Sequence, residues 1–136
     1  MSKIAINPNA SGTGTVTLTS PNTNSSYTIV LPSNDLGVLT DAASITPDFG
    51  TNTNFTVTLG GNRTMENPSN MVVGQSGSIF IVQDGTGSRT LSWGSYWDFI
   101  NGTAPTLTTT ASAVDRIDYI VRTATSIHTV FTANYS

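Results

Sequence analysis

The stretch GGNRTMENPSNMVVGQSGSIFIVQDGTGSRTLSWGS, residues 60–95, decides the fold class because apolar segments alternate in it with glycine-marked turns. The segment SIFIVQ, residues 78–83, is apolar on both faces, which is typical of a central strand covered on both sides. In the DGTG sequence that follows, Gly85 and Gly87 permit the positive φ of a tight hairpin turn. The stretch contains no His and no Cys, so it indicates structure rather than chemistry.

Alternating patterns continue on both sides of this stretch. NFTVTL, residues 54–59, alternates apolar residues with polar ones, and DRIDYIVRTATSIHTVFTANYS, residues 115–136, contains two such segments that predict a β-hairpin. No segment shows the 3.6-residue apolar period of a helix. Short strands with turns every ~8–12 residues predict an all-β domain, either an antiparallel β-sandwich, a jelly roll or a small barrel.

The N-terminal part has its own strand patterns. GTGTVTLTSP, residues 12–21, and YTIVLP, residues 27–32, both alternate and are separated by turn-forming residues. We therefore predict an N-terminal arm and β-hairpin over residues 1–45 and a sandwich domain over residues 46–136. Because a lone hairpin is marginally stable in water, this one is expected to pack on the rest of the chain or on a neighbouring chain.

Composition excludes several classes of function. Charged residues make up 10% of the 136 residues, far below the usual ~25%, and the net charge is -3. The five basic residues are scattered, which argues against nucleic-acid binding. No apolar run approaches the ~20 residues that span a membrane, and the N-terminus lacks the apolar core of a signal peptide, so we expect synthesis in the cytoplasm. A surface this poor in charge offers little repulsion against self-association.

The residues that carry chemistry do not form a recognisable catalytic or metal site. His128 is the only histidine, and sequence alone does not place it beside a nucleophile. Asp115 and Asp118 lie three apart on one strand, so they face opposite sides of the sheet. Asp84 lacks the further spaced acidic ligands of a calcium loop, and Glu66 is the only glutamate. We predict no catalytic residue, no metal and no cofactor.

The aromatic residues Tyr96, Trp97 and Phe99 lie in the longest irregular stretch. They are candidates for an exposed aromatic patch, which would let them stack on sugar rings. The alternative is that they plug one end of a sandwich and belong to the core.

Residues 57–136 resemble a small β module of tailed-bacteriophage virion proteins. The motifs that carry the resemblance are GNRT at 61–64, GQSG at 74–77, QDGTGSRTLSW at 83–93 and the DYIVRTATSIHTV hairpin at 118–130. The N-terminal sequence TVTLTSPNTNSSYTIVLPSNDLGVLT also resembles a segment common in phage fibre and decoration proteins. The resemblance implies a structural virion protein that assembles as a homotrimer.

At 136 residues, the chain is expected to leave no room for a fibre shaft plus a tip. Together with the resemblance, this favours a capsid decoration (cement) protein that binds the major capsid protein and stabilises the shell, located on the capsid surface of the virion. The alternative is a head- or tail-fibre module that contacts other fibre proteins or binds host-surface glycans. Neither hypothesis involves nucleic acid, a membrane or catalysis.

Assembly requires apolar side chains that meet a neighbour. The first residues would suit an arm that adds a strand to a capsid edge, and the N-terminal strands would supply the surface between subunits. The candidate trimer or capsid interface comprises Ile4, Ile6, Val16, Leu18, Ile29, Leu31, Leu36 and Val38.

Overall fold

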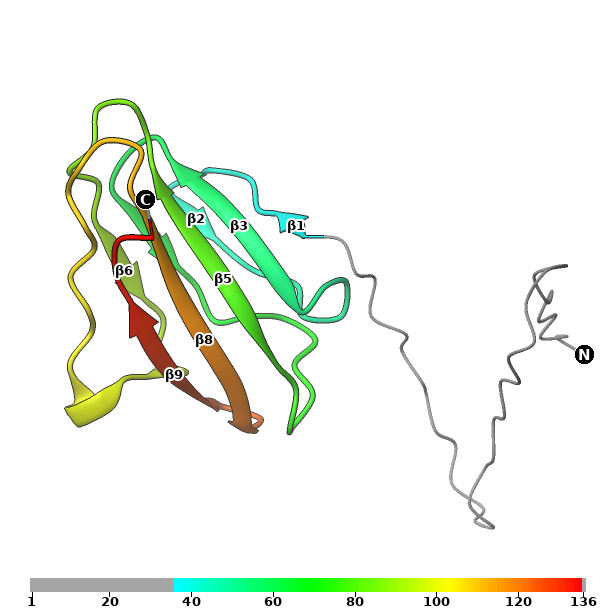
Figure 1. The fold of residues 1–136 in the computed structure, drawn as a ribbon. Coiled ribbons are helices and arrows are strands. Elements are labelled where there is room, and N and C mark those ends of the chain that lie inside the picture. The colour runs from blue at the N-terminus through cyan, green and yellow to red at the C-terminus, as the bar shows by residue number, and fades with distance from the viewer. Residues whose placement is uncertain (1–35, 136) are drawn as a thin grey trace, which may run out of the picture.

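The computed structural model describes residues 36–135, which form two β-sheets and no α-helix (Figure 1). The all-β class predicted from the sequence is therefore confirmed. The strands are β1 Gly37–Val38, β2 Ser44–Ile45, β3 Asn54–Leu59, β4 Arg63–Met65, β5 Ser76–Gln83, β6 Leu91–Trp93, β7 Trp97–Asp98, β8 Val114–Thr123 and β9 Ser126–Thr132, with one 3-10 turn, η1, at Ile100–Gly102.

The first six strands alternate between the two sheets. The large sheet has the order β1-β3-β5-β8-β9-β7, and the small sheet has the order β2-β4-β6. β1, β3 and β5 pair in parallel, as do β2, β4 and β6. The chain therefore winds as a two-sheet coil, in which each turn contributes one strand to each sheet.

This winding corrects two expectations from the sequence. The large sheet is mixed and the small sheet is parallel, rather than both being antiparallel, because a chain that passes to the other sheet after each strand returns in the same direction. The DGTG turn, residues 84–87, does not close a hairpin: it leads from β5 in the large sheet towards β6 in the small sheet.

The C-terminal part closes the large sheet with antiparallel strands. β8 pairs with β5, and β9 pairs with β8, so the hairpin predicted within residues 115–136 is confirmed. β7 then adds to the outer side of β9 in parallel, with Trp97 opposite Ile127. Figure 1 shows β5, β8 and β9 side by side, although β5 and β8 are separated by the whole of β6, β7 and η1 in the sequence.

The core lies between the sheets and is centred on a ring stack that sequence analysis did not identify. Phe49, in the connection from β2 to β3, stacks on Tyr119 with 4.4 Å between ring centroids and on Phe55 with 5.8 Å. Trp97 meets the edge of the same group at 6.3 Å from Phe49. The alternation of β3, β5 and β8 supplies the large sheet's main share of the core, the buried residues Val57, Leu59, Ile79, Ile81, Ile117 and Val121. The small sheet adds the buried residues Ile45, Met65 and Leu91.

A buried carboxylate anchors the long connection before β8. Asp115 accepts hydrogen bonds from the backbone N–H and the hydroxyl of Thr108, both at 2.7 Å, and from the backbone N–H of Asn134 at 2.9 Å. Asp118 lies on the opposite face, where it pairs with Arg116 at 2.8 Å, as the alternation of the strand predicted. Three hydrogen bonds offset the cost of burying the Asp115 charge and fix the connection against the sheet.

At Gly77 the backbone of β5 lies very close to the backbone of Thr53, the residue that precedes β3. A Cβ atom at this position of β5 would collide with the carbonyl oxygen of Thr53, which also accepts a 2.8 Å hydrogen bond from the Tyr119 hydroxyl. By contrast, a Cβ atom on Gly85 would meet nothing within 4 Å.

We expect the Gly77→Ala substitution to lower the free energy of unfolding by at least about 2 kcal/mol, because the added methyl group must push backbone apart. The matched control Gly85→Ala should change it by less than about 0.5 kcal/mol. Urea denaturation of the full chain, followed by circular dichroism, measures both. Equal stability of the two variants would contradict the assigned close approach.

Candidate binding surfaces

The structure places the predicted interface residues in two different situations. Ile4, Ile6, Val16, Leu18, Ile29 and Leu31 lie outside the described residues. Leu36 and Val38 lie at the edge of the large sheet, and both are exposed, Val38 to 81%. Their role in an interface stays a prediction.

The three aromatic residues do not form an exposed patch, which corrects that expectation. Trp97 is only 5% exposed, and its indole N–H donates a 3.0 Å hydrogen bond to the Glu66 carbonyl oxygen. Tyr96 and Phe99 are half-buried and pack against the core. The cause is the short strand β7, whose pairing with β9 turns Trp97 inward and Asp98 outward. Trp97 therefore belongs to the core, the second of the two alternatives.

A hollow of about 370 Å³ lies next to β7, beside the edge of the large sheet. Two exposed apolar side chains line it, Ile100 at 69% and Val130 at 53% exposure. Asp98 and His128 lie opposite each other in the β7–β9 pair and add polar groups to the same hollow. Phe99 contributes a half-buried ring. Apolar contact surface and hydrogen-bonding groups thus lie side by side.

The polar groups in and beside this hollow do not form a serine–histidine–aspartate triad. The Ser126 hydroxyl donates a 2.5 Å hydrogen bond directly to the Asp98 carboxylate. In a catalytic triad the histidine stands between these two groups and takes the proton of the serine. Within residues 36–135 no hydrogen bond links His128 to either of them. The Thr129 hydroxyl donates to the Asp98 carbonyl at 2.8 Å and fixes β7 against β9.

The DGTG turn is held by its own side chains. The Asp84 carboxylate accepts hydrogen bonds from the backbone N–H groups of Thr86 and Gly87, both at 2.9 Å, and pairs with the Arg89 guanidinium at 2.7 Å. The hydrogen bond from Arg89 lowers the pKa of Asp84 to about 2 from its ordinary 3.8. Within the described residues, no group of three or more His, Asp or Glu side chains is placed to hold a metal ion.

This pKa predicts a defined acid dependence of stability. A carboxyl group whose pKa is lower in the folded state stabilises the fold above its unfolded pKa and loses that contribution as the pH falls. We expect Asp84→Asn to unfold at a lower temperature than the wild type at pH 7, with the difference shrinking between pH 4 and pH 2. Thermal unfolding across this pH range tests it. A difference that stays constant down to pH 2 would contradict the assigned Asp84–Arg89 pair.

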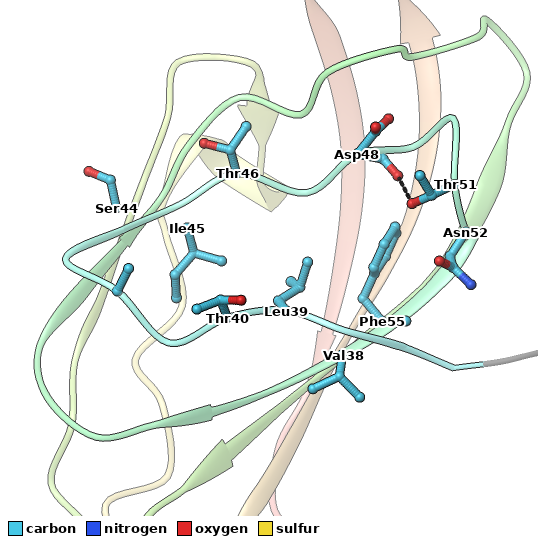
Figure 2. Close-up of a pocket in the computed structure, with 12 residues that line it drawn as sticks. Val38, Leu39, Thr40, Ser44, Ile45, Thr46, Asp48, Thr51, Asn52 and Phe55 are labelled. Carbon is cyan, nitrogen blue, oxygen red and sulfur yellow. Dashed lines mark hydrogen bonds between the residues drawn. The ribbon is translucent and has the colours of Figure 1, made fainter.

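A second hollow, of about 440 Å³, lies at the N-terminal end of the coil (Figure 2). β1, β2, the connections that follow them and the start of β3 line it, and its apolar residues are Val38, Leu39, Ala42, Ile45 and Phe55. Val38 points to the other side of the strand from Leu39 (Figure 2). The Thr51 hydroxyl donates a 2.8 Å hydrogen bond to the Asp48 carbonyl and closes the turn beside the hollow.

Neither hollow was predicted from the sequence. Both depend on strands of two residues, β1 and β2 at one end and β7 at the other, which are too short to show an alternating pattern. For the hollow beside β7, the available sequence signal was the apolar Ile100 directly before the turn-forming pair Asn101-Gly102. No helix among residues 36–135 has the length and apolar character needed to cross a membrane.

Residues 45–126 match a family model described as "Putative phage tail fibre C-terminal domain". Because the match covers more than half of the chain, the protein belongs to this family of phage structural proteins. No curated protein and no solved structure matches the chain. The family supports a virion component, and it favours the tail-fibre hypothesis over the capsid decoration protein.

Proposed function

We propose that this protein is a non-enzymatic tail-fibre module that binds host-surface glycans in the hollow beside β7. The observation that carries the proposal is the combination, at one sheet edge of a tail-fibre family member, of exposed Ile100 and Val130 with Asp98 and His128. A sugar ring presents hydroxyl groups at its rim and C–H groups on its faces. A site that offers apolar contacts and a few hydrogen-bonding groups is complementary to both.

The position of the hollow also supports a binding role. It lies where β7 ends and η1 begins, on short irregular backbone held by a rigid sheet, which is where proteins commonly carry binding residues. The carbonyl of Asp98 and the hydroxyl of Ser126 are already hydrogen-bonded within the protein. The exposed His128 imidazole therefore supplies the polar group for specificity, and Ile100 supplies contact area.

The test is binding of the full chain, fluorescently labelled, to an array of bacterial capsular polysaccharides and lipopolysaccharide O-antigens. We expect His128→Ala and Ile100→Glu each to reduce binding at least tenfold, because they remove a polar contact and place charge on the apolar rim. Val73→Glu is the matched control, since Val73 is 64% exposed and does not line the hollow. It should bind within twofold of the wild type.

Thermal unfolding of each variant separates loss of binding from loss of folding. The proposal is wrong if the wild type binds no glycan on the array, or if Val73→Glu loses binding as severely as Ile100→Glu at equal thermal stability.

We also propose that the module works as a homotrimer within the fibre. Phe80 and Val82 on β5 point away from the core and are half-buried, and Ile120 on the neighbouring strand β8 is exposed. The same face carries Arg116 and Asp118 of β8, which pair with each other at 2.8 Å, so it meets little net electrostatic repulsion from a second copy. Sedimentation equilibrium of the full chain should give a trimer, and Ile120→Glu should shift it towards monomer. A wild-type monomer at all concentrations would refute this part.

The capsid decoration protein, which binds the major capsid protein at the capsid surface, differs from this proposal in location. Immunogold labelling of intact virions with antibody against the chain distinguishes the two. Label on the tail fibres supports the present proposal, and label on the head would replace it.

A further inference from the structure

Arg122, near the end of β8, differs from the other arginines that the structure describes. Three of these arginines form ion pairs at 2.7 or 2.8 Å: Arg63 with Asp41, Arg89 with Asp84 and Arg116 with Asp118. Among residues 36–135, Arg122 pairs with no carboxylate, although its side chain is exposed. Its Nε–H donates a 3.3 Å hydrogen bond to the Ser126 hydroxyl oxygen. The guanidinium charge is therefore held in place without being neutralised.

A β-bulge determines where the Arg122 side chain lies. Val121 of β8 lies opposite Ile127 of β9. Two residues further along β8, Thr123 lies opposite Ser126, which is only one residue away from Ile127. Arg122 is thus the extra residue of β8. Because a bulge re-aims the side chain of its extra residue, Arg122 contacts Ser126 instead of joining the regular rows across the sheet.

Ser126 connects Arg122 to the hollow beside β7. The Ser126 hydroxyl oxygen accepts the Nε–H of Arg122, and the same hydroxyl donates to the Asp98 carboxylate at 2.5 Å. Asp98 lines the hollow and lies opposite His128. Ser126 and His128 are two residues apart on β9, so they face the same side of the sheet. The guanidinium therefore lies just beyond Asp98, on the side of the sheet to which His128 points.

The contact with Ser126 leaves one edge of the guanidinium for a ligand. Arginine has five N–H donors in a planar fork, and Ser126 occupies the one on Nε. The two Nη atoms form an edge that can donate to both oxygens of one carboxylate, the geometry for which arginine is suited. Asp98 does not fill this role, because Ser126 stands between its carboxylate and the guanidinium.

We infer that the ligand is an acidic glycan, in which a sugar such as a uronic acid carries a carboxylate, and that Arg122 selects it. This inference rests on the glycan binding proposed above. The sugar ring would contact Ile100 and Val130 in the hollow, and its carboxylate would extend past Asp98 to the Nη atoms of Arg122. The net charge of the chain is -3, so no general attraction for anions contributes. The preference therefore depends on the geometry of one guanidinium.

The experiment measures binding of the full chain, fluorescently labelled, to capsular polysaccharides that contain uronic acids. Each polysaccharide is printed in its native form and after chemical reduction of its carboxyl groups to primary alcohols. We expect the wild type to bind the native form at least about tenfold more tightly, the effect of a hydrogen-bonded charge pair. Arg122→Gln should bind the two forms within about twofold of each other, because it removes the charged fork.

Two further variants separate the fork geometry from net charge. Arg122→Lys keeps the charge but not the fork, so we expect it to bind the native form at least about threefold more weakly than the wild type. Arg116→Gln is the matched control, since Arg116 lies on the same strand, does not line the hollow and pairs with Asp118. It changes the net charge by the same amount and should keep the wild-type preference within about twofold. Thermal unfolding checks that each variant is folded.

The possible results distinguish this inference from the proposed function. A wild type that binds no glycan would refute both. A wild type that binds native and reduced forms equally, or an Arg122→Gln variant that keeps the preference, would refute the selection of carboxylates and leave glycan binding standing. Binding that follows phosphate-bearing polysaccharides and ignores carboxyl reduction would also overturn it. If Arg122→Lys matches the wild type, or Arg116→Gln loses the preference, charge alone explains the binding and the assigned role of Arg122 is wrong.

Discussion

Parallel backbone pairing between successive turns is the constraint on which this structure depends. A strand that pairs in parallel with an earlier one must first leave the sheet and return, because a tight turn reverses the direction of the chain. Here the excursion is used to build the second sheet, so β1, β3 and β5 alternate with β2, β4 and β6. The core between the sheets then follows, since each strand has one face towards the partner sheet and Phe49 fills the space between them.

The two edges of the large sheet are built differently. On the C-terminal side the antiparallel hairpin of β8 and β9 interrupts the parallel winding, and the connection that Asp115 holds packs beside it. On the N-terminal side β1 and β2 pair in parallel with β3 and β4, and within residues 36–135 they are edge strands of the two sheets. Gly77 shows how tightly the turns approach, since its neighbour is the Thr53 backbone itself.

The long strands could be predicted from the sequence, but their order could not. β3, β5 and the β8–β9 hairpin are long enough to show a strand pattern, and all were predicted. The strands β2 and β7 have two residues each, which is too few to establish a period. Pairing direction depends on contacts between distant positions, such as Gly37 with Phe55, which local patterns do not encode. Trp97 was ambiguous for the same reason, because only its pairing with Ile127 turns it inward.

The order of the strands places two different surfaces at opposite edges of the large sheet. This separation matters for how the domain would be arranged in a fibre. Among the described strands, β1 and β7 are the two edges of the large sheet, so β1 and the hollow beside β7 lie at opposite sides of the same layer. Ile100 and His128 are exposed beside β7, at the edge that lies farthest from β1 in the strand order. In the proposed function, a contact of the β1 edge with another part of a fibre would therefore not compete with a glycan in the hollow beside β7. The strand order thus separates the parallel, coiled end of the large sheet from the antiparallel end that carries the proposed site.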